Sequence, residues 1–143
     1  MRKVIEGNVD LSNLNLTELF NLSDVEVMGY FFCFNNNLTN LKGAPQTIGG
    51  SFDCQGNNLT NLEGGPHTVG ESFYCAHNNL TSLEGAPHTV GYSFNCSYNN
   101  LTSLGGAPKT VGGNFYIDKA LRDKFPEEYI RSLCKIKGKV VYI

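Results

Sequence analysis

The sequence predicts a solenoid, a fold in which short repeats of one chain stack in a single direction. Three observations predict it. Four cysteines recur at a constant spacing of 21 residues, at positions 33, 54, 75 and 96. The segments around them align without a gap from Val27, Ile48, Val69 and Val90. Every repeat also carries an Asn-Asn pair and Gly residues, which favour turns, so the chain turns at fixed places.

Each repeat reads Val-Gly-x-Ser-Phe-x-Cys-x-x-Asn-Asn-Leu-Thr-x-Leu-x-Gly-x-Pro-x-Thr. The Phe-x-Cys stretch alternates with a period of two, so Phe and Cys point to one face of a short strand. Leu-Thr-x-Leu adds two inward side chains, and Gly-x-Pro ends that segment. One repeat buries too little to be stable alone, and stacking buries each layer against the next. We therefore expect a parallel sheet with strands about 4.8 Å apart.

The repeat divides the chain into three regions. Residues 1–26 match the pattern as a divergent N-terminal repeat or cap if one residue is inserted before Val27, residues 27–118 hold the 21-residue repeats, and residues 119–143 form a C-terminal α/β cap. In this cap, residues 119–124 and 125–134 have helical patterns, and residues 139–143 resemble a strand. We expect a cap because an open solenoid end exposes its core and a sheet edge.

The run Phe-x-Cys-x-x-Asn-x-Leu resembles the core of a leucine-rich repeat, with Phe and Cys in the first two Leu positions. Residues 99–104, Asn-Asn-Leu-Thr-Ser-Leu, are similar to the short repeats of bacterial type III effector proteins. The form with Gly-Ala-Pro and Val-Gly-x-Ser-Phe resembles still more the leucine-rich repeat proteins of bacteria and bacteriophages. Over about residues 5–118, this resemblance implies a leucine-rich repeat solenoid with a parallel β-sheet on its concave face and a small helical and strand cap at the C-terminal end. The resemblance implies a protein-binding role with no fixed partner. It departs from the effector ligases, because no separate catalytic domain comes after the repeats in this sequence.

Two columns of the repeat are expected to be structural. Each Cys replaces a core Leu, Leu11 and Ile117 fill the matching end positions, and the short paired spacings of a metal site are missing. We therefore favour core packing over a metal site or a disulfide. By the resemblance, the first Asn of each pair satisfies backbone groups of the turn that would otherwise be buried without partners. The structural positions are Cys33, Cys54, Cys75, Cys96, Asn36, Asn57, Asn78 and Asn99.

Side chains that alternate with Phe and Cys are expected to face away from the core, on the concave sheet face. The middle column is Asp10, Phe32, Asp53, Tyr74, Asn95 and Tyr116, and the columns beside it include Ser72 and Ala76. Exposed apolar patches and Tyr-rich surfaces mark interaction sites. Two alternatives stay open: aromatic residues simply favour strands, or another segment, such as residues 20–26, covers them. The predicted partner-binding residues are Tyr30, Phe32, Phe34, Asp53, Gln55, Tyr74, Tyr92, Asn95, Tyr98 and Tyr116.

Motifs and charge favour a binding module over an enzyme. The sequence has no Gly-x-Ser-x-Gly, phosphate loop or His-Glu-x-x-His motif, so we predict no catalytic residue, no metal, no cofactor and no small-molecule substrate. Residues 1–118 carry four basic and ten acidic side chains, a net charge of −6, and residues 119–143 carry seven basic and three acidic ones, a net charge of +4. The acidic body argues against nucleic acid as the main partner. The alternative is nucleic-acid contact through Lys135, Lys137 and Lys139.

The sequence therefore predicts a non-enzymatic protein–protein interaction module that binds a protein partner through its concave face. The resemblance extends this to a phage- or bacterium-encoded inhibitor or adaptor, for example an antagonist of a host defence system. Because there is no membrane-spanning apolar run, no signal-peptide pattern and no sign of disulfide framework among the five cysteines, we expect a cytoplasmic protein, in the host if phage-encoded. We expect a monomer or weak oligomer. The alternative is a structural or self-assembling component, such as part of a virion.

Overall fold

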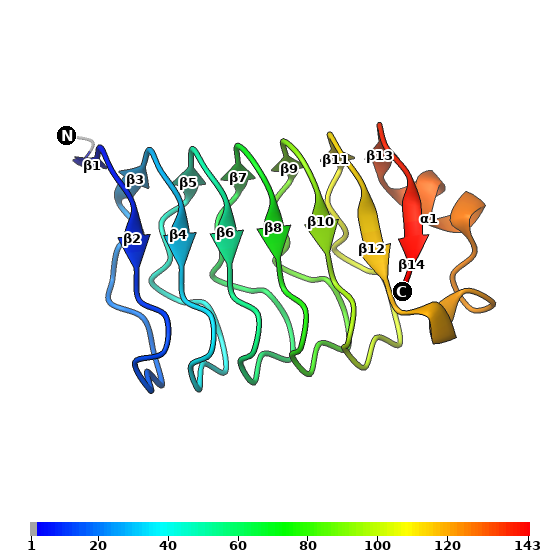
Figure 1. The fold of residues 1–143 in the computed structure, drawn as a ribbon, viewed down its shortest axis with the longest axis horizontal. Coiled ribbons are helices and arrows are strands. Elements are labelled where there is room, and N and C mark those ends of the chain that lie inside the picture. Colours follow the sequence, from blue (N-terminus) through cyan, green and yellow to red (C-terminus); the bar gives the residue numbers. More distant parts are fainter. Residues whose placement is uncertain (1–2) are drawn as a thin grey trace.

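The chain folds as a parallel β-solenoid, whose coils stack side by side along one long axis (Figure 1). The structure is a computed structural model that describes residues 3–143. Two parallel sheets of seven strands each run along the stack, and each coil adds one strand to each sheet. The fold class predicted from the sequence, a repeat solenoid with a small C-terminal cap, is confirmed.

The first sheet, which we call the Phe sheet, contains the strand predicted from Phe-x-Cys. In the interior of the stack, the partners lie 21 residues apart, as in Phe31–Phe52 and Phe52–Phe73, so the sequence repeat is also the strand register. Its strands are β2 (Val9–Asp10), β4 (Phe31–Phe32), β6 (Phe52–Asp53), β8 (Phe73–Tyr74), β10 (Phe94–Asn95), β12 (Phe115–Ile117) and β14 (Val140–Tyr142).

The second sheet, which we call the Thr sheet, was not predicted. Most of its strands are a Thr-Val or Thr-Ile pair, in which Thr is exposed and Val or Ile lies in the core. The sequence did not reveal these strands, because a pair of residues is too short to show a periodic pattern. Three residues, such as 49–51, turn the chain from this sheet to the Phe sheet. The strands are β1 (Lys3–Ile5), β3 (Val25–Val27), β5 (Thr47–Ile48), β7 (Thr68–Val69), β9 (Thr89–Val90), β11 (Thr110–Val111) and β13 (Lys135–Ile136).

The core consists of columns of identical side chains, one from each coil. Phe31, Phe52, Phe73 and Phe94 are fully buried, and the ring centroids of neighbours lie 5.2–5.6 Å apart with their planes within 13° of parallel. The Cys column, two Leu columns and the Val column of the Thr sheet fill the remaining interior. Because every layer repeats the same shapes, each coil packs against the next in the same way.

Residues 3–26 form the first coil of the stack. In the Phe sheet Val9 pairs with Phe31, an offset of 22 that accommodates the expected one-residue insertion. The inward side chains of this coil, Ile5, Val9, Leu11 and Leu16, are only half-buried, whereas their counterparts in the interior coils are fully buried. Among residues 3–143, the apolar layer of this coil is therefore only partly covered.

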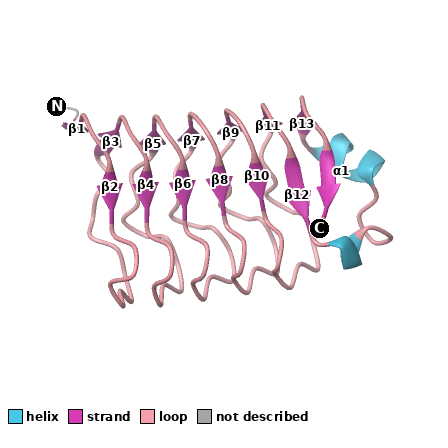
Figure 2. Ribbon diagram, in the orientation of Figure 1, coloured by secondary structure: helices cyan, strands magenta, loops and turns pink. Residues whose placement is uncertain are grey.

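The C-terminal residues complete a seventh coil and cover its end. The expected helix over 119–124 is a 3₁₀ turn, η1 (Lys119–Leu121), and the expected helix over 125–134 is α1 (Glu127–Leu133). The expected final strand is β14, but β13 was missed, because its Lys-Ile pair has no sequence likeness to the Thr-Val pair with which it aligns. Figure 2 shows the helical segments gathered at this one end. Phe125 and Ile130 are buried there against the last layer.

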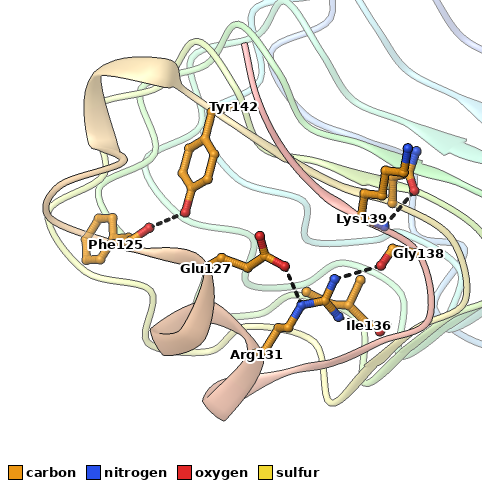
Figure 3. Close-up of polar contacts among 8 residues, drawn as sticks. Phe125, Glu127, Arg131, Ile136, Gly138, Lys139 and Tyr142 are labelled. Atoms are coloured by element: carbon orange, nitrogen blue, oxygen red, sulfur yellow. Dashed lines mark hydrogen bonds and ion pairs between the residues drawn. The ribbon is translucent and has the colours of Figure 1, made fainter.

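One arginine forms hydrogen bonds with two carbonyl groups at this end (Figure 3). Arg131 donates to the carbonyl oxygens of Ile136 and Gly138 at 2.9 and 2.8 Å, and its Nε pairs with Glu127 at 2.8 Å. Tyr142 donates its hydroxyl to the carbonyl oxygen of Phe125 at 2.6 Å. The cap is thus held by polar contacts as well as apolar ones. Within residues 3–143, none of the helices has the length and apolar character required to cross a bilayer.

Candidate protein-interaction face

The middle column predicted from the sequence forms one row across the Phe sheet, and we call it the outward row. Its members pair in register from strand to strand. None of them belongs to the core cluster, which takes Phe and Cys from the alternating positions. Asp10 is exposed, Asp53 is buried, and the other four are half-buried. The outward row consists of Asp10, Phe32, Asp53, Tyr74, Asn95 and Tyr116.

Three aromatic side chains lie together on the second coil. The rings of Tyr30 and Phe32 stack with centroids 3.9 Å apart and planes 15° from parallel, and the ring of Phe34 lies 5.6 Å beyond Phe32. All three residues are half-buried. Residues 20–26 do not lie in the Phe sheet, because they lead into β3 of the Thr sheet. The three rings therefore form a contiguous aromatic surface whose members contact one another.

The polar members of the outward row share a local hydrogen bond. In Asp10, Asp53 and Asn95, Oδ1 accepts the backbone N–H of the residue two positions later, each time at 3.0 Å. Such Asx turns stabilise the chain where a strand ends. This role was missed in the sequence, although the alternation of Asp or Asn with an aromatic residue was visible. The row therefore alternates a rigid aromatic ring with a fixed carboxyl or amide group.

Asp53 is the most unusual member, because it is buried although it is an acidic residue, and it has an aromatic strand partner on each side. It is 8% exposed, and its strand partners are Phe32 and Tyr74. Burial raises the pKa of Asp53 to about 6, although the hydrogen bond from the Gln55 backbone opposes the shift. Hydrogen bonds from Ser12 lower the pKa of the exposed Asp10 instead. The charge at the centre of the row therefore changes near pH 6.

We expect the variant Asp53→Asn to be more stable than the wild type at pH 7.5. Because the pKa of about 6 in the folded state exceeds the ordinary 3.8, the native state favours the protonated group. The resulting penalty on stability is absent below about pH 4 and complete above about pH 6. Asn keeps the Asx hydrogen bond, as Asn95 shows. Urea unfolding should give a gain of about 1–3 kcal/mol at pH 7.5 and almost none at pH 4. An equal gain at both pH values would contradict this origin.

The remaining predicted binding residues lie at the borders of the row. Gln55 follows Asp53 and is half-buried. Tyr92 is 63% exposed at the corner between the two sheets, and Tyr98 is 55% exposed at the turn that follows the Phe sheet. The Tyr98 ring stacks on His77, with centroids 4.4 Å apart. Both residues have a φ of 56°, at a turn position where earlier coils carry Asn35 and Gly56. His77 and Tyr98 thus form a second, separate aromatic pair at the turn that follows the Phe sheet.

The two columns beside the outward row are less exposed than predicted. Ser72 and Ala76 are each only 3% exposed, so their prediction as outward surface residues was wrong. Ser72 Oγ accepts the backbone N–H of Ser93 at 3.2 Å, and Ser51 does the same for Ser72. A small side chain at these positions is covered by its neighbours in adjacent coils. The Ser column therefore links successive coils at the corner between the sheets.

The Asn column also links successive coils. In Asn78, Oδ1 accepts the backbone N–H of Leu59 at 3.1 Å, and Nδ2 donates to the carbonyl oxygens of Cys54 and Cys75 at 3.1 and 3.2 Å. Asn36 and the other members make the same kind of contacts. The amide groups thus pair backbone groups of two coils at once.

The cysteine thiols lie inside the core and are free of disulfides. Cys33, Cys54, Cys75 and Cys96 are fully buried, and this burial raises the pKa of each thiol well above its ordinary value. A neutral thiol is a poor nucleophile and a poor metal ligand. Among residues 3–143, no cluster of three or more His, Cys, Asp or Glu side chains could hold a metal ion. The column packs as small apolar groups do.

The fold defines the class of protein as a repeat solenoid, a parallel β-solenoid of 21-residue repeats with a covered C-terminal end. No protein-family model, curated protein or solved structure matches the chain.

Proposed function

We propose that the chain is a non-enzymatic protein-binding module, acting as an inhibitor or adaptor, that binds its partner through the outward row of the Phe sheet. The observation that supports this most is the in-register row of aromatic side chains outside the core. These rings belong neither to the core cluster nor to the Asn column that links the coils. Aromatic side chains are enriched among the residues that dominate the energy of protein interfaces.

The scaffold also favours binding because it holds the row in place before a partner arrives. Each row residue lies on a strand paired on both sides or at a strand end closed by an Asx turn. Tyr30 and Phe32 are further held by their stacking. Side chains that are already ordered lose little conformational entropy on association, so more of the contact energy appears as affinity.

The arrangement of the basic residues favours a protein partner over nucleic acid. Lys135 lies in β13 of the Thr sheet, whereas Lys137 and Lys139 lie at the corner that leads to β14 of the Phe sheet. The three lysines are therefore spread around a corner at one end of an acidic body. A nucleic-acid site more often presents a continuous basic stripe that follows the phosphates.

The proposal is tested by capture from a bacterial lysate with immobilised protein. The double variant Phe32→Ala/Tyr74→Ala should retain at most about one tenth of the partner captured by the wild type, because two aromatic contacts at an interface centre are each worth more than about 1 kcal/mol. The matched control, Thr68→Ala/Thr89→Ala, changes two exposed residues of the Thr sheet and should capture as much as the wild type. Circular dichroism establishes that each variant is folded.

Mass spectrometry identifies the captured protein. Equal capture by wild type and the Phe32→Ala/Tyr74→Ala variant would reject the Phe sheet as the binding face. Sedimentation velocity at several concentrations tests the alternative function, a structural or self-assembling component, because such a component would form regular assemblies of the chain itself.

A further inference from the structure

We propose that the outward row binds a polyproline II segment of the partner with a basic side chain at every third position. Asp10 and Asp53 bind two successive basic side chains, and Phe32 and Tyr74 pack against the residues between them. This inference rests on the proposed function, and it names the chemistry of the partner segment.

The spacing of the row carries the first step. Neighbouring strands of a sheet lie about 4.8 Å apart, so Asp10 and Asp53, two strands apart, lie about 9.6 Å from one another along the row. The aromatic members Phe32, Tyr74 and Tyr116 repeat at the same interval. A polyproline II helix has three residues per turn and rises 3.1 Å per residue, so side chains on one side recur about every 9.3 Å.

Other segment conformations do not match this interval. On one face of a β-strand, side chains recur about every 6.7 Å, and on one face of an α-helix about every 5.4 Å. A polyproline II segment that crosses the strands at right angles stays in step with the row over several residues. Its backbone also forms no internal hydrogen bonds, and aromatic side chains are the usual contacts for it in binding domains.

Charge complementarity carries the second step. Residues 1–118 have a net charge of −6, and the row itself contains two carboxyl groups and no basic side chain. Phe32 and Tyr74 are the strand partners of Asp53 on its two sides, so a cation that pairs with this carboxyl group has an aromatic residue on each neighbouring strand. A guanidinium group suits this position best, because it pairs with a carboxylate and stacks on aromatic rings at once. The burial that disfavours the isolated Asp53 charge strengthens its attraction to a cation.

Defined peptides test the spacing. A fluorescent peptide of five Arg-Pro-Pro units is compared by anisotropy, at pH 7.5 and 0.15 M salt, with a peptide of equal length and charge whose arginines occupy every second position. The three-residue spacing should bind at least tenfold more tightly, and a Glu-Pro-Pro peptide should not bind measurably. Equal affinity for both arginine spacings would overturn the polyproline II assignment.

Single substitutions test the residues. Asp53→Asn should weaken binding of the Arg-Pro-Pro peptide at least tenfold, whereas Glu63→Gln, which removes one charge from an exposed turn outside both sheets, should change it by less than twofold. Asn95→Asp adds a third carboxyl group at the same interval and should strengthen binding several-fold. Equal effects of Asp53→Asn and Glu63→Gln would show a response to net charge alone and would overturn the proposal.

The outcome separates this inference from the proposed function. Because Asp53→Asn is expected to be more stable than the wild type, weaker binding by this variant does not arise from unfolding. If the peptides do not bind, while Phe32→Ala/Tyr74→Ala still loses the captured lysate protein, the inference fails and the binding function stands. If the peptides bind as predicted, but neither Asp53→Asn nor Phe32→Ala/Tyr74→Ala changes capture of the lysate protein, the row is not the site that binds the partner.

Discussion

Replacing Asn78 with Ala is expected to lower the free energy of unfolding by about 3–5 kcal/mol, a large part of the stability of an ordinary domain. Asn78 is 7% exposed, and its side chain pairs one backbone N–H and three backbone carbonyl groups across two coils. Removing the amide leaves the buried N–H of Leu59 without this acceptor, which costs about 1–3 kcal/mol. The carbonyl oxygens of Cys54 and Cys75 each keep a second donor, from Asn57 and Asn99, so each of these lost bonds costs about 0.5–1.5 kcal/mol. The volume left behind is too polar to be refilled by the neighbouring apolar side chains.

The measurement is urea unfolding followed by circular dichroism. The matched control is Asn79→Ala at the next position, where the side chain is exposed, and we expect it to change stability by less than about 0.5 kcal/mol. Hydrogen exchange adds a local test, because the amide of Leu59 should lose protection in Asn78→Ala and keep it in the control. Similar stabilities of the two variants would show that the Asn column does not hold the coils together.

The second large effect is expected for Gly85→Ala, which should destabilise the protein by about 3 kcal/mol or more. Gly85 has a φ of +90°, a conformation that residues with a side chain rarely adopt. A Cβ atom here would also lie 2.3 Å from the backbone of Leu62 and Glu63 in the preceding coil. Backbone atoms inside a stack cannot move aside without disturbing the adjacent layer. Gly43, Gly64 and Gly106 have the same conformation in their coils.

Gly105→Ala is the control for this prediction. Gly105 does not have a positive φ, and a Cβ atom there would meet only the ends of two side chains, Glu84 Oε1 at 3.0 Å and Ser103 Oγ at 3.2 Å. Earlier coils carry Lys42, Glu63 and Glu84 at this place, so the fold accepts a side chain. Urea unfolding should therefore give a free energy of unfolding within about 1 kcal/mol of the wild type. Any change should be stabilising, because Ala restricts the unfolded chain more than Gly does. If both variants unfold at the same urea concentration, the steric argument for Gly85 is wrong.

The proposed binding face and the stability of the chain are connected at Asp53. Asn would keep the Asx turn and avoid burying a charge, yet this coil carries Asp, whereas the equivalent position two coils later carries Asn95. A residue that lowers stability is a common feature of binding sites, because function and stability place different demands on one position. The opposite effects expected for Asp53→Asn, higher stability and weaker peptide binding, would establish this connection.

The columns of the stack could be predicted from the sequence. A period of 21 repeated without gaps places each Phe, Cys and Leu above its counterpart, and the alternation of Phe-x-Cys assigns Phe31 and Cys33 to the inside and Phe32 to the outside. These properties depend on neighbours along the chain, which the sequence displays directly. The order of residues in the outward row, and hence the candidate binding face, followed from the same pattern.

Other features depend on residues in adjoining coils, and they became visible only in three dimensions. The Thr sheet consists of strands mostly two residues long, whose existence rests on hydrogen bonds between coils rather than on a local pattern. Asp53 is buried on a strand whose partners at this position, Phe32 and Tyr74, are each 21 residues away in the chain. β13 aligns with β11 because α1 returns the chain to the end of the stack. In each case the layers above and below a residue determine its environment, and these contacts cannot be predicted from the sequence of a single repeat.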